Sequence, residues 1–173
     1  MTVLKKFYNG VGLLSEWSGR VVSVAIPALV VVITFDVFMR YVFNNPTNWA
    51  YELSYMLGTA TISLGLPYVH YHASHIRVDI IYSRLAPMAK LVLDILLTLL
   101  LFFPLVFMWT KTFGANAWQS FLTHETSYDS LWYPVLWPFK TIIVLGFFLL
   151  LLQGIATFAR DVATLARGGR TPW

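Results

Sequence analysis

Apolar residues are gathered along this chain into four long runs, at residues 21–43, 49–69, 91–110 and 135–158. Each run is close to the roughly 20 residues that a helix needs to cross the hydrocarbon core of a bilayer. Lipid offers the backbone no hydrogen bonds, so a segment inside it must be helical. The pattern therefore predicts an all-α membrane protein with four transmembrane helices, folded as a single domain over residues 1–173.

Shorter segments outside these runs carry apolar residues on only one side of a helix. In residues 1–20 the apolar positions recur at helical spacing, and Lys5 and Lys6 lie off that face. The face consists of Val3, Leu4, Phe7, Tyr8, Val11 and Leu14. Residues 78–85 repeat the pattern on a smaller scale, and the connection 113–134 is expected to begin in the same way. These segments are predicted to be amphipathic helices that lie at the membrane surface.

The first two runs are joined by only a few residues, 44–48. So short a connection predicts an antiparallel helical hairpin, and its Asn and Thr side chains are suited to cap the second helix. Proline occurs inside two of the runs, at Pro27 and Pro104. We expect each proline to bend its helix locally.

Charge predicts which side of the membrane each end of the chain occupies. Of the 12 Lys and Arg residues, nine flank the runs on the side of the two termini. These are Lys5, Lys6, Arg20, Arg77, Arg84, Lys90, Arg160, Arg167 and Arg170, against Arg40, Lys111 and Lys140 on the other side. The positive-inside rule places both termini, with the tail at residues 159–173, in the cytoplasm. An aromatic cluster is then expected at the outer interface, formed by Trp109, Trp118, Tyr128, Trp132, Tyr133 and Trp137.

The composition agrees with a membrane protein, since 58% of the residues are hydrophobic and 12% are charged. Soluble domains carry about 25% charged residues. The net charge of +4 is small and scattered, which argues against a nucleic-acid partner. The chain has no cysteine, which excludes disulfides, thiolate metal sites and a cysteine nucleophile. The first run is too long for a signal peptide and ends in charged residues, so we expect it to be retained.

Three charged residues are expected to meet near the outer end of the hairpin. Asp36 and Arg40 are four residues apart and share a helix face, while Glu52 lies in the first turn of the second helix. Such a cluster can fix the register of the hairpin, or present a charge to a partner protein or lipid headgroup. Transfer of protons or ions is a third role, but one such cluster makes no path across the membrane.

Small residues form a stripe along the second run, at Ser54, Gly58, Thr61 and Gly65. Their spacing places them on one helix face, and small faces allow helices to approach closely in lipid. The stripe is expected to pack within this bundle or against a separate subunit.

Histidines do not support a cofactor site in this chain. His70, His72 and His75 cluster at the inner end of the second run, and His124 lies on the opposite side of the membrane. A haem held between helices needs axial ligands at matching depth, which this arrangement lacks. The middle of every run is also almost purely apolar. These residues indicate a supporting subunit with no cofactor, neither an enzyme nor a carrier.

Two motifs resemble those of a known family. The hairpin Asp36-Val37-Phe38-Met39-Arg40-Tyr41-Val42-Phe43-Asn44, followed by Trp49 and Glu52, is similar to the small membrane subunit (DctQ type) of tripartite ATP-independent periplasmic (TRAP) transporters. So is the inner segment His75-Ile76-Arg77-Val78-Asp79-Ile80-Ile81. The resemblance implies structural or interfacial roles for Arg40, Trp49, Glu52, Arg77 and Asp79.

The resemblance also implies a setting in the bacterial inner membrane. A large permease subunit would carry the substrate and sodium sites and move as an elevator, and a periplasmic binding protein would deliver an acidic organic solute. This chain would brace the permease and help to dock the binding protein, for which Glu125 and Asp129 in the outer segment are candidates. Carboxylates, sugar acids, keto acids and sulfonates stay open as solutes. The alternatives are a membrane anchor of a respiratory enzyme and a small self-contained oligomeric transporter.

Overall fold

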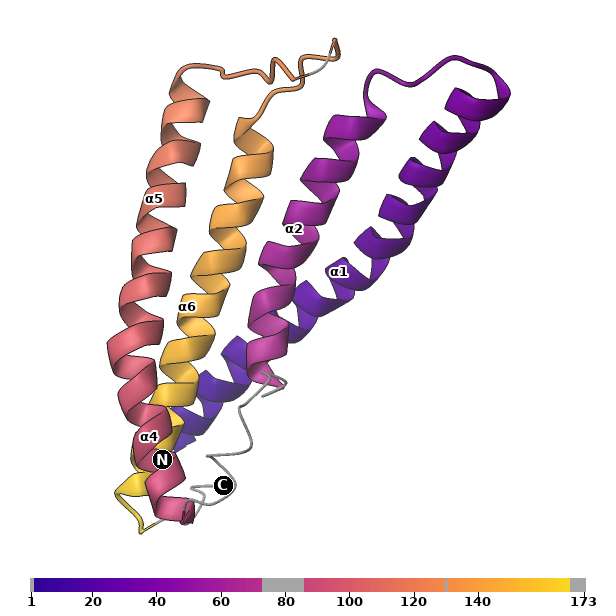
Figure 1. The fold of residues 1–173 in the computed structure, drawn as a ribbon. Coiled ribbons are helices and arrows are strands. Elements are labelled where there is room, and N and C mark those ends of the chain that lie inside the picture. The colour runs from indigo at the N-terminus through magenta and orange to yellow at the C-terminus, as the bar shows by residue number, and fades with distance from the viewer. Residues whose placement is uncertain (1, 73–85, 130, 169–173) are drawn as a thin grey trace.

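The computed structural model describes residues 2–72, 86–129 and 131–168, which form a bundle of long helices (Figure 1). In chain order these are α1 Thr2–Val42, α2 Ala50–Tyr71, α4 Pro87–Leu97, the π-helix η1 Thr98–Phe102, α5 Phe103–Leu122 and α6 Trp137–Leu165. Within the described residues the only extended pairing is one antiparallel bridge between Thr126 and Val135. The prediction of an all-helical fold is confirmed.

Three helices are long and apolar enough to cross a membrane, namely Leu4–Val42, Met88–Leu122 and Trp137–Leu165. α2 is shorter and carries more polar side chains, and it does not belong to this group. It nevertheless runs beside α6, which lies between α2 and α5 (Figure 1). Length and composition therefore support three of the four predicted spans, and α2 accompanies them as a fourth helix.

The segment 1–20 does not form a separate surface helix, because α1 continues from Thr2 through Pro27 to Val42. At about 1.5 Å per residue its 41 residues extend about 60 Å, twice the thickness of a hydrocarbon core. Its N-terminal half lies against α6 and α2, and its C-terminal half diverges from the bundle (Figure 1). Of the predicted apolar face, Val11 is buried, whereas Phe7 and Leu14 are exposed. Ser15, which lies outside that face, is also buried. The structure therefore shows no break between residues 1–20 and the first apolar run.

The third span is also longer than predicted. α4, η1 and α5 follow one another without a break, so the segment expected to start a new interfacial helix at residue 113 continues the span to Leu122. At the centre, the Phe103 N–H donates to the Thr98 carbonyl five residues back. Pro104 follows directly and has no N–H, so one hydrogen bond of the α-helical backbone is missing here. A π-turn is one of the ways in which a helix accommodates a proline. The expected irregularity at Pro104 is present as this π-turn.

Large side chains fill the seam between α5 and α6. Val106, Phe147 and Leu150 are its buried centre. The Phe147 ring stacks on Phe113 with centroids 5.1 Å apart and meets Trp109 edge-on at 5.4 Å. α6 approaches α2 much more closely, because a Cβ at Gly146 would collide with the Ser63 backbone. α6 is therefore the central helix, with an aromatic seam on one side and a small-residue crossing on the other.

Candidate functional site

The α1–α2 hairpin is held by Asp36. Its carboxylate accepts a hydrogen bond from Arg40 Nη2 at 2.8 Å, from the Thr47 N–H at 3.1 Å and from the Thr47 hydroxyl at 2.5 Å. Thr47 therefore ties the connecting loop to α1. The predicted side-chain cap of α2 is not formed, since Trp49 occupies the N-cap position without a side-chain hydrogen bond. The Trp49 ring stacks instead on Phe35 of α1, with centroids 6.0 Å apart.

Glu52 does not join the predicted three-residue cluster. It is 3% exposed, and its Oε1 accepts a hydrogen bond of 2.6 Å from the hydroxyl of Ser127 in the α5–α6 loop. Its second oxygen, Oε2, is buried and has no hydrogen-bond partner among the described residues. Asp36 and Arg40 pair as expected, with Arg40 more than half exposed. The hairpin thus carries two separate polar contacts, one closing its loop and one holding a distant loop.

The α5–α6 loop is folded by its own backbone. The Ser127 N–H donates to the Pro134 carbonyl at 2.9 Å, and the Leu136 N–H donates to the Glu125 carbonyl at 3.0 Å. His124 and Tyr133 have positive φ angles of 48° and 52°, so they turn the chain at the two ends of this pairing. The α5–α6 loop is therefore a small hairpin that Ser127 fastens to the start of α2.

The two predicted docking residues have different surroundings. Glu125 is half-buried and forms an ion pair of 2.5 Å with Lys140 of α6. The hydrogen bond from Lys140 holds the pKa of the Glu125 carboxyl below its ordinary range. Asp129 is exposed and makes no ion pair within the described part of the chain. Glu125 fixes the loop, whereas Asp129 presents a negative charge to the surroundings.

Aromatic side chains surround Asp129 in the sequence. Tyr128 is 82% exposed, and Trp132 and Tyr133 are about half exposed. The rings of Tyr128 and Tyr133 meet edge-on at 6.1 Å. The tip of the loop therefore combines the exposed Asp129 carboxylate with several exposed aromatic side chains, and aromatic residues are enriched in protein contact surfaces.

The small-residue stripe of α2 is not where this bundle packs most closely. Gly58 and Gly65 both have open space where a Cβ would lie, while the collision with α6 occurs at Ser63. Ser54 bonds to the Tyr51 carbonyl of its own helix. Contact of the stripe with a separate subunit stays a prediction.

A second small-residue face, on α1, was missed by the sequence reasoning. Cβ atoms at Gly12 and Gly19 would collide with the rings of Tyr71 and Tyr68, so both glycines allow α2 to approach. Between them, the buried Ser15 hydroxyl donates to Gln153 of α6 at 3.0 Å. The sequence does contain a pattern that predicts this face, because Gly12, Ser15 and Gly19 have the helical spacing seen in the small-residue stripe of the second run. The prediction for residues 1–20 considers only their apolar residues.

The end of the bundle that holds the N-terminus carries a second polar contact. Arg160 Nη1 donates to the Tyr8 hydroxyl at 3.0 Å, and the guanidinium lies 5.2 Å from the centroid of that ring. Arg77 and Asp79 of the inner motif, with His75 and the predicted helix 78–85, lie outside the described residues. His70 stacks on Phe102, and His72 meets Tyr68 at a tilt with centroids 4.4 Å apart, so both rings contribute to packing.

Comparison with known proteins identifies a family. A family model described as "Tripartite ATP-independent periplasmic transporters, DctQ component" matches residues 29–164, which is most of the chain. The match begins inside α1 and ends one residue before the end of α6, so it includes the α1–α2 loop and the α5–α6 loop. No curated protein matches the chain.

Proposed function

The chain belongs to the DctQ family of tripartite ATP-independent periplasmic transporter components, and from this premise we propose that it is the small scaffold subunit of a sodium-coupled importer. Its partners would be a large permease subunit, which binds sodium and an acidic organic solute, and a periplasmic binding protein that delivers the solute. The chain is a transporter component and not an enzyme. The family match also favours this role over that of an anchor for a respiratory enzyme.

The positions of the charged residues favour a scaffold role for this chain over a carrier role. The charged residues lie at the two ends of the bundle, and residues 21–35, 53–69, 95–110 and 141–152 contain no charged side chain. The polar contacts follow the same division, with Asp36, Glu52 and Glu125 at one end and Arg160 at the other. Passage of a charged solute needs polar groups along a path, because an uncompensated charge in lipid costs about 3 kcal/mol or more. Such a path would therefore lie in the companion subunit.

The exposed surface of α1 supports contact with that companion. Beyond the crossing with α6, large apolar side chains point outward around this helix, among them Val24, Val31, Phe38 and Tyr41. We infer that lipid covers part of this surface and that the permease covers another part. Arg40 at the outer end would meet the permease or the headgroups.

We place the chain in the bacterial inner membrane with both termini in the cytoplasm, and α2 as a fourth span. The 22 residues of α2 extend about 33 Å, which is enough to cross the hydrocarbon core. The bias of basic residues toward the side of the termini supports the orientation. In this orientation the folded α5–α6 loop faces the periplasm, where a binding protein arrives. We propose that Asp129 and the neighbouring aromatic rings contribute to docking.

Reconstitution tests the proposal directly. Proteoliposomes would contain the permease alone, this chain alone or both, with the binding protein and an acidic solute outside under a sodium gradient. We expect uptake only with both subunits present. Accumulation of solute by this chain alone would contradict the scaffold role, and uptake by the permease alone at the full rate would show that the chain is dispensable.

A further inference from the structure

Two grooves lie side by side on the inner half of α1 and share Arg20. The first, of about 540 Å³, lies between α1 and α2, and its part toward the membrane interior is lined by Ser23, Ile26 and Gly65. The second, of about 560 Å³, lies along α1 and is lined by Trp17, Arg20, Val21, Val24, Ala25 and Ala28. Both begin near residues 16–20 and continue along α1 toward residues 26–28, which is toward the membrane centre.

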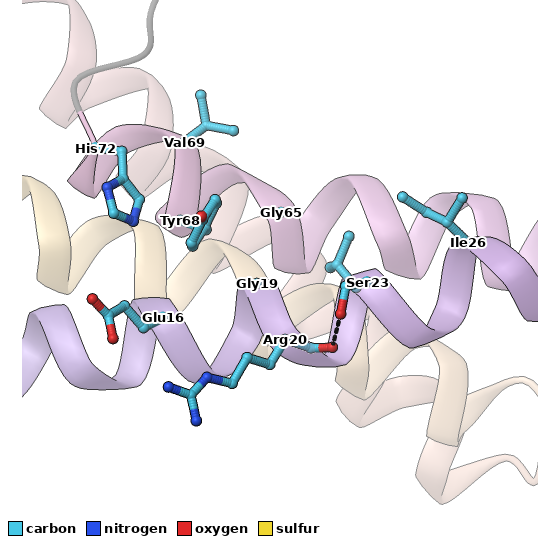
Figure 2. Close-up of a pocket in the computed structure, with 10 residues that line it drawn as sticks. Glu16, Gly19, Arg20, Ser23, Ile26, Gly65, Tyr68, Val69 and His72 are labelled. Carbon is cyan, nitrogen blue, oxygen red and sulfur yellow. Dashed lines mark hydrogen bonds between the residues drawn. The ribbon is translucent and has the colours of Figure 1, made fainter.

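Opposite charges stand at the beginning of these grooves. Figure 2 shows Glu16 and Arg20 projecting from α1 toward the same end of the first groove, with Glu16 on the side of His72 and Arg20 on the other. They are four residues apart, yet they form no ion pair with each other, and Arg20 has no ion-pair partner in the described part of the chain. Trp17, which is 64% exposed, lies one turn from Arg20, and tryptophan favours the depth of the headgroups.

We propose that this region binds a glycerophospholipid with a primary-amine headgroup, of the phosphatidylethanolamine type. The phosphate would accept hydrogen bonds from Arg20, the ammonium would donate to Glu16, and one acyl chain would occupy each groove. A guanidinium matches a phosphate through several hydrogen bonds, which gives it geometric preference as well as charge. The arrangement fits a zwitterion better than an anionic lipid, because Glu16 would repel a headgroup without a positive charge. The inference requires only that the chain lies in a membrane, so it can fail or hold independently of the transport role.

The test is a lipid titration of the full chain, purified in detergent and stripped of lipid, with bound lipid counted by native mass spectrometry. The probes are phosphatidylethanolamine, phosphatidylcholine and phosphatidylglycerol with identical palmitoyl and oleoyl chains. We expect the ethanolamine lipid to bind tightest, by about tenfold over the anionic lipid, which corresponds to about 1.4 kcal/mol. Equal binding of all three, or preference for phosphatidylglycerol, would overturn the assignment.

Variants separate the two charges. Arg20→Gln should weaken all three lipids by about tenfold, because all carry the phosphate, whereas Glu16→Gln should remove only the preference for the amine headgroup. Lys5→Gln, which removes a charge elsewhere on the same helix, is the matched control and should bind as the parent chain does. Arg20→Gln binding lipids as tightly as Lys5→Gln would also overturn the proposal.

A further pair of variants tests the groove without changing charge. Gly65→Leu introduces a side chain into the space between α1 and α2, where no atom lies within 4 Å of the position that a Cβ would take, so it should reduce lipid binding without disturbing the fold. Gly114→Leu on α5 fills an equally open position away from Arg20 and serves as its control. Equal lipid binding by the two glycine variants would show that the groove between α1 and α2 holds no acyl chain.

Discussion

The Asp36 carboxylate accepts three hydrogen bonds in the α1–α2 hairpin. It accepts from Arg40 and twice from Thr47, whereas Arg40 bonds to Asp36 alone among the described residues and is far more exposed. Hydrogen bonds to a charged group typically contribute about 1.5–3 kcal/mol, and an exposed ion pair contributes about 0–1 kcal/mol. The two members of the pair should therefore differ in their importance for the hairpin.

We predict that Asp36→Asn destabilises the chain by about 1–2 kcal/mol and that Arg40→Gln destabilises it by less than about 1 kcal/mol. The asparagine keeps the shape but loses the charge that strengthens all three hydrogen bonds. Denaturant unfolding of the purified chain in detergent micelles would measure both. A larger loss for Arg40→Gln would mean that the guanidinium, and not Thr47, closes the hairpin.

Arg40 has a second predicted effect, which concerns assembly. Because its guanidinium is exposed at the outer end of α1, Arg40→Ala should lower the yield of the complex with the permease more than it changes the apparent affinity for solute. Co-purification on a tagged permease measures the first quantity, and uptake by the assembled fraction measures the second. Normal assembly with altered sodium dependence would contradict an interfacial role for Arg40.

Glu52 and Ser127 form a buried pair whose members are 75 residues apart in the chain. We predict that Ser127→Ala destabilises the fold by about 1–3 kcal/mol, because it leaves a buried carboxylate without its partner. Adding Glu52→Gln to that variant should restore part of the loss, since a neutral amide is less costly to bury unpaired. Unfolding of the single and double variants, with proteolysis of the 123–136 loop as a second readout, measures this coupling. Additive losses would show that the hydrogen bond contributes little.

At the scale of helices, hydropathy predicted where apolar helices lie but not where they end. Residues 1–20 and 113–122 were separated from their spans because their apolar pattern is one-sided, yet each continues a helix whose backbone bonding does not depend on that pattern. The contact of Glu52 with Ser127 could not be predicted, because it depends on how a folded loop lies over α2. The Asp36–Arg40 pair could be predicted, since helical periodicity alone brings the two residues together.

The α2–α6 crossing gives a prediction at this scale. A Cβ at Gly146 would collide with the Ser63 carbonyl, so Gly146→Ala should force the helices apart and destabilise the fold by about 1–3 kcal/mol. Gly114→Ala is the control, because its Cβ position is open and alanine favours a helix over glycine by up to about 1 kcal/mol. Thermal unfolding in detergent compares the two. A neutral or stabilising effect of Gly146→Ala would mean that the crossing is looser than its geometry indicates.

At the scale of the whole molecule, polar contacts concentrate at the ends of an apolar bundle. The outer contacts hold the α5–α6 loop on both sides, through Ser127 to α2 and through Glu125 to Lys140 of α6. A loop fixed in this way loses little conformational freedom when a partner binds, which favours affinity. These properties support the docking role that we propose for this end of the bundle, in which Glu125 holds the loop and Asp129 contacts the partner.

This division of roles predicts different results for the two carboxylates. Asp129→Lys should raise the binding-protein concentration needed for half-maximal transport by about tenfold while the loop stays protected from protease, because one charged contact is reversed. Glu125→Lys should expose the loop to protease, because it places two positive charges together, and Glu125→Lys with Lys140→Glu should restore protection. An unchanged half-maximal concentration for Asp129→Lys would argue against docking at this loop.

The pH dependence of protease protection tests the role of Glu125 in holding the loop. The Glu125 carboxyl has a lowered pKa in the folded chain, so its ion pair contributes stability that is present above the ordinary pKa of glutamate and is lost as the pH falls through the lower, folded value. Protease protection of the loop should therefore be unchanged between about pH 7.5 and about pH 5.5, a window above the ordinary range of a glutamate carboxyl. Glu125→Gln removes the charge at every pH and should increase cleavage throughout this window. Loss of protection in the parent chain near pH 6 would show that a group other than Glu125 holds the loop.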